Sequence, residues 1–247
     1  MTHNTAGPRA MEALLRGATR LPREFRSREH LLDPATVCEV LDPFLSDERR
    51  ERIERVVSER CGSVAVVVDG LANSGNVAAV MRTAEGLGFL NFHVIQRQLP
   101  YKHSRRTTQG TDKWLDVHVW DGPAECVRVA RAAGMRIVAA HLDRRSRPLD
   151  DFDFTIPTAL VFGNELGGVS EDLLEMADAT CIIPMTGFAQ SFNISVAAAT
   201  CLYHARSDRM RRQGRHGDLG LADQAWLRAA YTYLSVQAAQ PILDRGA

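Results

Sequence analysis

The sequence predicts an α/β fold, in which a mostly parallel sheet is flanked by helices and helical extensions stand at the N- and C-terminal ends. Two observations predict it. Between Ser63 and about residue 212, short apolar runs rich in β-branched residues alternate with segments of helical periodicity, a pattern typical of parallel strands joined by helices. The chain has 247 residues, of which 45% are hydrophobic and 24% charged, enough for one large domain with appendages or two small ones.

The N-terminal extension, residues 1–62, is expected to be an arm followed by a basic helix. Residues 1 to about 30 are rich in Arg, Pro and small polar residues, a composition that predicts a loose arm. The helix should begin at Ser46 or Asp47 and end at Gly62. Three apolar residues share one of its faces: Ile53, Val56 and Val57. Its arginines lie largely on other faces, where they either are solvated or contact a partner.

Residues 63–212 are expected to form the central domain. Each strand is a short apolar run: 63–70, 89–95, 115–120, 135–142, 158–164 and 181–185. The first run is apolar and β-branched without interruption, which indicates a strand buried on both faces of the sheet. Helices are expected at the following positions: 76–88 with Asn76 as its N-cap, 122–134, 170–178 and 193–212. Residues 213–247 should supply a linker and one further helix, 222–240.

Composition excludes several classes of protein. The formal net charge is zero, so any basic surface for a nucleic acid must be local. The five cysteines are scattered, without a CxxC pair or a Cys/His cluster, which argues against a disulfide framework and against a metal site. The start of the chain lacks the apolar core of a signal peptide, and no apolar run is long enough to span a bilayer. We expect a cytoplasmic protein with no membrane contact and no metal.

Three loops at the carboxyl ends of predicted strands are candidates for a ligand site, because ligands of parallel sheets bind there. They are residues 69–76, 163–168 and 186–193. The first loop lacks the GxGxxG of a dinucleotide site, and the second lacks the GK[ST] ending of a phosphate loop. Ser191, in the third, is not framed by the GxSxG of a serine hydrolase. The familiar mononucleotide, dinucleotide and hydrolase sites are therefore disfavoured.

The three loops resemble motifs of the TrmH/SpoU branch of SPOUT methyltransferases. The stretch "NSGNVAAVMRTAEGLGF" is similar to the first motif, with its Asn and an Arg six residues on. "LVFGNELGGVSEDLLEMAD" is similar to the second, and "IIPMTGFAQSFNISVAAA" to the third. The resemblance covers roughly residues 47–212. It implies a trefoil-knotted domain, usually a homodimer, with S-adenosyl-L-methionine as methyl donor and an RNA ribose 2′-hydroxyl as acceptor.

The resemblance also implies roles for individual residues. Catalytic positions match Arg82, Asn76, Glu165, Ser191 and Asn193. Positions in the cofactor pocket match Ala140, Gly163, Ile183 and Phe192. Basic positions of the tRNA-acting members match Arg52, Arg60, Lys113 and Arg209. Taken alone, Ile183 and Phe192 would be core residues, Ser191 a turn former and Asn193 a helix N-cap; the motifs as a whole favour the functional roles.

Arg82 occupies the position of the catalytic arginine, which is proposed in the family to act as a general base. A guanidinium with a pKa above about 12 hardly deprotonates. We therefore expect Arg82 to bind the phosphate beside the target ribose with its planar fork. The alternative is an ordinary helix arginine paired with Glu85. Glu165 is expected to hold the geometry of its loop, with proton acceptance as its alternative.

The RNA substrate is less closely specified than the reaction. The loop "QRQLPYKHSRRTTQGTDKW" interleaves basic and aromatic residues, which suits phosphate contacts with base stacking. The resemblance favours a tRNA, with a guanosine of the D-loop as target. However, "ANSG" stands where tRNA enzymes of this branch often have His-Lys-Pro-His, so ribosomal RNA stays open as the alternative. Two alternatives belong to other classes of protein. One is a non-catalytic RNA-binding dimer, and the other is an oxidoreductase, which the missing dinucleotide motif disfavours.

Overall fold

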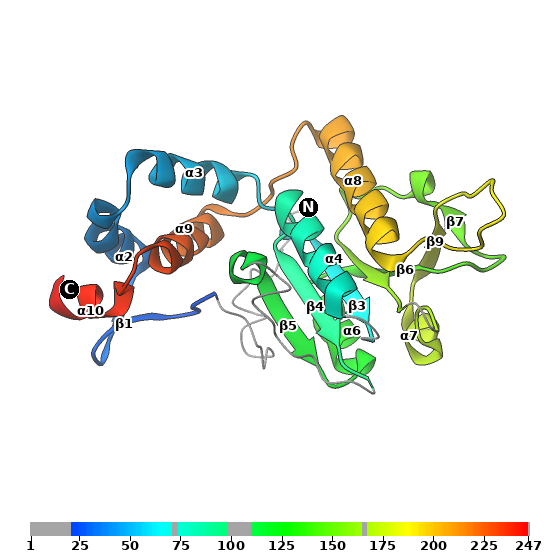
Figure 1. Ribbon diagram of the computed structural model, residues 1–247, viewed down its shortest axis with the longest axis horizontal. Helices are drawn as coiled ribbons and strands as arrows, with labels where there is room; N and C mark the ends of the chain where they lie inside the picture. Colours follow the sequence, from blue (N-terminus) through cyan, green and yellow to red (C-terminus); the bar gives the residue numbers. More distant parts are fainter. Residues whose placement is uncertain (1–20, 71–73, 98–109, 165–166, 247) are drawn as a thin grey trace, which may run out of the picture.

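The computed structural model describes residues 21–70, 74–97, 110–164 and 167–246, and it is built around one parallel sheet (Figure 1). The strands are β3 (Val64–Asp69), β4 (Asn91–Ile95), β5 (Asp116–Trp120), β6 (Arg136–Ala140), β7 (Arg147–Pro148), β8 (Thr158–Phe162) and β9 (Ala179–Ile182). Their order is β5-β4-β3-β8-β6-β9-β7, and each neighbouring pair is parallel. The predicted fold class is confirmed; β7 was not predicted.

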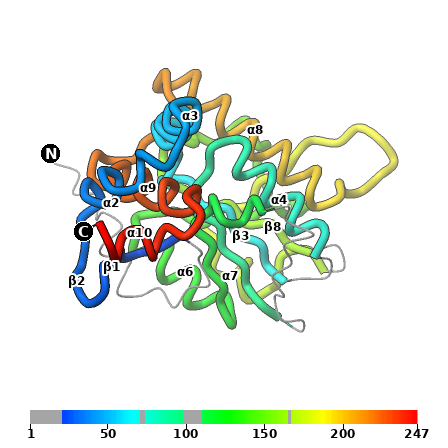
Figure 2. The backbone as a smooth tube through the Cα atoms, turned by 60° about the vertical axis from the view of Figure 1, so that its left-hand side comes forward, coloured from blue at the N-terminus to red at the C-terminus, as the bar shows by residue number. Residues whose placement is uncertain are grey.

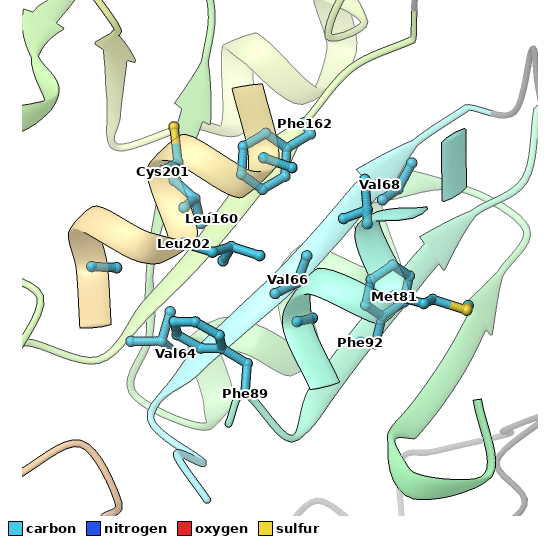
Figure 3. Close-up of a cluster of buried hydrophobic side chains, with 14 of the residues drawn as sticks. Val64, Val66, Val68, Met81, Phe89, Phe92, Leu160, Phe162, Cys201 and Leu202 are labelled. Carbon is cyan, nitrogen blue, oxygen red and sulfur yellow. The ribbon is translucent and has the colours of Figure 1, made fainter. Parts of the chain in front are cut away.

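Helices cover both faces of this sheet. On one face lie α4 (Ser74–Gly86) and α8 (Ile194–Gln213), and on the other α6 (Pro123–Ala132) and α7 (Glu171–Met176). Alternate residues of β3 divide between the two faces, as the strand period of two requires. Val64, Val66 and Val68 pack beneath α4 and α8 (Figure 3), while Ala65 and Val67 face α6. Every residue of β3 is buried, in agreement with its uninterrupted apolar sequence.

The start of α4 differs from the prediction. Asn76 was expected to be its N-cap, but the helix begins at Ser74, so Asn76 lies within the first turn. The prediction for α8 is confirmed. The Asn193 side chain accepts a hydrogen bond from the Ser195 amide, and Gly214 ends the helix with a φ of 72°. That left-handed conformation explains why a glycine stands there.

The two terminal extensions pack together into one helical unit. It comprises β1 (Phe25–Ser27), β2 (His30–Leu32), α2 (Pro34–Leu41), the 3-10 helix η1 (Asp42–Phe44), α3 (Asp47–Ser58), α9 (Leu221–Ser235) and α10 (Ala239–Gly246). Both ends of the chain contribute to its apolar core, with Phe25, Leu41 and Ile53 meeting Tyr231 and Leu243. Figure 2 shows the blue N-terminal and red C-terminal segments side by side. The sequence had predicted two separate extensions.

Two expectations for these extensions were wrong in detail. The arm was expected to be loose up to about residue 30, yet Phe25 to Leu32 form an antiparallel hairpin. The last helix was expected to run unbroken from 222 to 240, but it divides into α9 and α10. Ala238 has a φ of 60° between them, which a continuous right-handed helix does not allow.

The segment that joins α8 to α9 is fixed by a buried ion pair. Arg209 is 1% exposed and donates hydrogen bonds to Asp218 (2.7 Å), the His216 carbonyl (2.9 Å) and the Ser63 hydroxyl (2.9 Å). Asp218 also accepts from the Gly62 amide at 2.6 Å. A side chain committed in this way cannot reach an RNA phosphate. The predicted RNA contact at Arg209 is therefore corrected, and the residue joins the linker to the first strand.

Among the described residues, no helix combines the length and apolar character needed to cross a bilayer.

Asp218→Ala should lower the free energy of unfolding by about 3 kcal/mol, because it leaves the buried Arg209 guanidinium without its carboxylate. Urea unfolding followed by circular dichroism measures this. Glu125→Ala is the control, since among the described residues Glu125 pairs only with the exposed Arg128, and the change should alter stability by less than about 1 kcal/mol. Equal stability losses in the two variants would contradict the role of the ion pair.

Candidate functional site

A cavity of about 470 Å³ lies at the carboxyl ends of β6, β8 and β9, beside the start of α8. Its wall contains all of the predicted cofactor residues, together with one predicted catalytic residue: Ala140, Gly163, Ile183, Phe192 and Ser191. Sequence analysis did not assign the other lining residues to the site, among them His141, Leu142 and Gln190. The first two directly follow β6, a position that could have identified them, because ligands of parallel sheets bind where strands end.

The loop after β8 shapes this cavity through a contact between two backbone segments. Asn164 and Gly168 exchange hydrogen bonds of 3.0 and 2.9 Å between their amides and carbonyls, so the loop folds back on the strand end. A Cβ atom at Gly163 would overlap the carbonyl carbon of Gly168 and the amide nitrogen of Val169. Only glycine permits this approach. Glu165, predicted to be catalytic, belongs to the same loop and lies outside the described residues.

The loop after β9 forms the other side of the cavity and extends away from the body of the molecule (Figure 2). Ser191 and Phe192 are both exposed and line the cavity. Asn193 follows them, and its Oδ1 accepts hydrogen bonds from the Ser195 amide (2.9 Å) and hydroxyl (2.6 Å). The N-cap role considered for Asn193 is therefore the observed one, and it fixes the loop that carries Ser191 at the cavity edge.

The wall of the cavity is uncharged. None of its described lining residues is an aspartate, glutamate, lysine or arginine. Two buried thiols, Cys181 and Cys201, contribute to it, and their mutual hydrogen bond lowers the pKa of Cys181 and raises that of Cys201. Such a wall suits a ligand bound by apolar contacts and backbone hydrogen bonds, which is how small-molecule pockets generally achieve affinity and orientation.

An ion-pair network holds the loop after β8 against the end of β3. Asp69 is 1% exposed and accepts hydrogen bonds from the Ser170 amide (2.8 Å) and from Arg97 (3.0 Å). Arg97 also pairs with Asp172 at 2.7 Å, and its hydrogen bonds hold the pKa of that carboxyl at about 2. Arg97, predicted to belong to a basic RNA-binding loop, thus has a structural role. Most of that loop, residues 98–109, lies outside the described residues.

The predicted catalytic residues of α4 do not line the cavity. Arg82 is exposed on the helix, and Asn76 is half-buried in its first turn. The helix packs beside α8 (Figure 1), whose N-terminal end borders the cavity. The Glu85 carboxylate, considered as a partner for Arg82, accepts a hydrogen bond of 2.9 Å from Arg60.

Arg60 is not an RNA contact, contrary to the prediction. It is 1% exposed, and its guanidinium is committed to Glu85 on α4, to the Tyr231 hydroxyl on α9 and to the Trp114 carbonyl. The sequence placed Arg60 at the end of a basic helix, where it would be solvated. The structure covers that end with α9, which sequence periodicity could not place.

Two other predicted RNA residues do lie on an accessible basic surface. Arg52 lines a small cavity of about 80 Å³ together with Arg49 and Trp114, and Lys113 directly precedes Trp114 in the chain. The Lys113 ammonium lies 4.3 Å from the centre of the Trp114 ring, and the Arg49 guanidinium 5.3 Å from it. Burial and the neighbouring Arg49 lower the pKa of Lys113. Within the described part of the chain, none of the three cations forms an ion pair, so together they favour an anion.

Comparisons with known proteins agree with the three motifs. The model of the SpoU rRNA Methylase family matches residues 63–203. A tRNA (guanosine(18)-2'-O)-methyltransferase of Aquifex aeolicus (strain VF5) is 34% identical over 171 residues, 69% of this chain and 81% of that protein. The crystal structure of the A. aeolicus TrmH/SpoU tRNA modifying enzyme is similar with a TM-score of 0.70 at 32% identity, over 77% of this chain and 98% of that one.

A third similar protein carries a ligand. The crystal structure of the SpoU methyltransferase AviRb from Streptomyces viridochromogenes, in complex with the cofactor AdoMet, gives a TM-score of 0.53 at 32% identity. The match covers 62% of each chain.

Gly163→Ala should weaken ligand binding in the 470 Å³ cavity, because the added methyl group displaces the loop after β8. Calorimetry with S-adenosylhomocysteine should show affinity reduced by about a hundredfold or more, an energy of roughly 2.7 kcal/mol or above. The control is Gly167→Ala in the same loop, where the nearest atom to an added Cβ lies 4.0 Å away. Wild-type affinity in Gly163→Ala would show that the backbone contact does not shape the site.

Proposed function

The chain belongs to the SpoU rRNA methylase family, and from this premise we propose that it transfers a methyl group from S-adenosyl-L-methionine to the ribose 2′-hydroxyl of a tRNA guanosine, position 18 of the D-loop. The observation that carries the proposal is the cavity at the ends of β6, β8 and β9, which the second and third sequence motifs build. A relative that acts on this nucleotide matches most of the chain. Ribosomal RNA is the second candidate substrate, because the name of the matched family refers to rRNA.

The cavity residues fit the cofactor. S-adenosyl-L-methionine supplies an electrophilic methyl group on a sulfonium. Ile183 and Phe192 offer apolar surface for its adenine and ribose, whereas Ala140 and Gly163 leave the backbone at two strand ends accessible. Accessible backbone amides and carbonyls can bond the polar edges of a nucleoside.

The catalytic roles fall to residues at the cavity edge and on α4. Arg82 binds the phosphate beside the target ribose, which orients the 2′-oxygen and stabilises the negative charge that develops as the hydroxyl loses its proton. Ser191 and Asn193 hold the loop of the third motif, and Asn76 supports the first turn of α4. The proposed role of Glu165 is to stabilise the conformation of the loop in the second motif. The retention of Arg82, Gly163 and Asn193 disfavours a non-catalytic RNA-binding dimer.

The RNA surface includes the cations around Trp114. Arg52 and Lys113 contact the backbone of the RNA, and Arg49 lies beside them. Phosphates supply most of the affinity in such complexes, and the half-buried indole of Trp114 offers its accessible part for stacking on a base. This surface lies where the helical unit meets the 3-10 helix η2 (Thr111–Trp114) of the central domain. The N-terminal extension therefore contributes to RNA binding, in the cytoplasm where tRNA is modified.

A homodimer completes the proposal, together with the trefoil knot that the family resemblance implies. Ala198 and Ala205 of α8 pack into the core of their own chain, so these small residues do not face a partner. The exposed face carries Val196 and Tyr203, which are 48% and 64% exposed. With Thr200 they follow an i, i+4, i+7 spacing, which places them on one side of the helix. This face, together with Phe192, is the surface for the second copy.

Arg82→Lys should slow single-turnover methyl transfer by about a hundredfold. Lysine keeps the charge but loses the bidentate fork, and misplacing a reacting group by about an ångström can cost that much. Affinity for S-adenosylhomocysteine should stay unchanged, and RNA affinity should fall only modestly. Near-normal turnover would remove Arg82 from catalysis, and a collapse of cofactor binding would place it on the donor side. Arg128→Lys on α6 serves as the control.

Light scattering should give a mass of twice the 27.3 kDa chain at micromolar concentration. Tyr203→Glu should convert the protein to a monomer, because it places a charge at the centre of an apolar symmetric contact. Leu221→Glu is the control, since Leu221 is even more exposed than Tyr203 but lies at the start of α9. A wild-type monomer, or a Tyr203→Glu dimer, would contradict the proposed interface.

A further inference from the structure

The C-terminal end of α4 is held by a residue from outside that helix. Arg60 donates to the backbone carbonyl of Glu85 from Nη1 at 2.8 Å and to its carboxylate Oε1 from Nη2 at 2.9 Å. Glu85 is in the last turn of α4, where carbonyls have no partner within the helix, and its carbonyl also accepts from the Gly88 amide at 3.1 Å. A guanidinium at this end also complements the helix dipole. Arg60 therefore fixes both the last turn of α4 and the side chain that it carries.

Arg60 is in turn oriented by α9, a helix of the C-terminal extension that lies beyond the matched family region, residues 63–203. Its Nε donates to the Tyr231 hydroxyl at 3.0 Å, and that hydroxyl donates to the Trp114 carbonyl at 2.6 Å. The hydroxyl thus accepts one hydrogen bond and donates another. Burial raises the pKa of Tyr231 to about 12, so the proton that this arrangement needs is retained.

The hydrogen bonds from Arg60 to Glu85 lie one helical turn away from Arg82, the proposed catalytic arginine. Arg82 and Glu85 are separated by three positions on α4, a spacing that places them on neighbouring parts of the helix surface. Any rotation or fraying of the last turn therefore moves Arg82. Reacting groups must be held within a fraction of an ångström, because a displacement of about 1 Å can cost a hundredfold in rate.

We propose that Tyr231 is a positioning residue for methyl transfer, which acts through Arg60 and Glu85 to fix α4 and so to aim Arg82 at the RNA. The inference rests on the proposed function. It gives the C-terminal extension a part in catalysis besides its part in folding. It also gives a role to the burial of Arg60, which follows a basic helix but makes two hydrogen bonds to α4 instead of facing solvent.

The test compares Tyr231→Phe with Tyr233→Phe. Both changes remove one hydroxyl from α9, but the Tyr233 hydroxyl bonds only Gln240, at 3.4 Å, among the described residues. Tyr231→Phe should slow single-turnover methyl transfer about tenfold, less than the hundredfold of a full displacement because Arg60 keeps its bonds to Glu85. The dissociation constants of S-adenosylhomocysteine and of the tRNA should stay within about twofold of wild type. Tyr233→Phe should match wild type in all three.

A second pair of variants separates positioning from general loss of structure. Arg60→Lys keeps the charge but cannot bond Glu85 and Tyr231 together. Arg228→Lys breaks a similar fork to Asp42 and Glu54 inside the helical unit, without contact to Glu85. In hydrogen exchange, Tyr231→Phe and Arg60→Lys should expose the amides of the last turn of α4, whereas both controls should leave them protected.

The outcomes are distinct. A tenfold slower rate with unchanged affinities and faster exchange at the end of α4 supports the inference. Equal rates for Tyr231→Phe and Tyr233→Phe would overturn it, and so would a rate loss in Tyr231→Phe and Arg60→Lys that Arg228→Lys reproduces. A wild type that binds S-adenosylhomocysteine but methylates no RNA would overturn the proposed function, and this inference with it.

Discussion

The cavity depends on the contact between Gly163 and the backbone of Gly168 and Val169. Without a Cβ atom, the loop after β8 folds back on its own strand and opens a space of about 470 Å³ at the sheet edge. The neighbouring strands are buried on both faces, so they hold this edge rigidly. Asp69 and Arg97 join the same loop to the end of β3. The protein thus builds its site from backbone geometry, with an uncharged wall, and places its charges outside it.

Two buried arginines connect the extensions to the central domain. Arg209 ties the linker to the start of β3 through Asp218, and Arg60 ties α3 and α9 to α4 through Glu85. Burying a guanidinium is unfavourable unless each of its donors finds a partner. Both residues meet that condition by bonding carbonyls as well as carboxylates. The result is a fixed angle between the helical unit and the sheet, and the basic surface around Trp114 lies at that junction.

Much of the central domain could be predicted from the sequence. Uninterrupted Val-rich runs identify buried parallel strands, and the motif residues at the strand ends identified most of the cavity wall. Arg60 and Arg209 were predicted wrongly because side-chain type does not reveal burial: Arg209 stands on α8 and Arg60 just after α3, both have charged neighbours, and distant segments cover them. Asn76 was misplaced by two residues because capping preferences do not fix a helix start. The union of both termini into one unit depends on long-range packing, which periodicity does not encode.

The proposed activity is transfer of a methyl group, from a cofactor bound in this cavity, to the ribose of a tRNA guanosine. The direct measurement is to incubate the purified protein with S-adenosylmethionine and an unmodified tRNA transcript, digest the RNA and identify the methylated nucleoside by mass spectrometry. We expect one 2′-O-methylguanosine per tRNA, at position 18, and none in a transcript whose D-loop lacks that guanosine. A methyl group on a base, or no methylation by protein that binds S-adenosylhomocysteine, would contradict it.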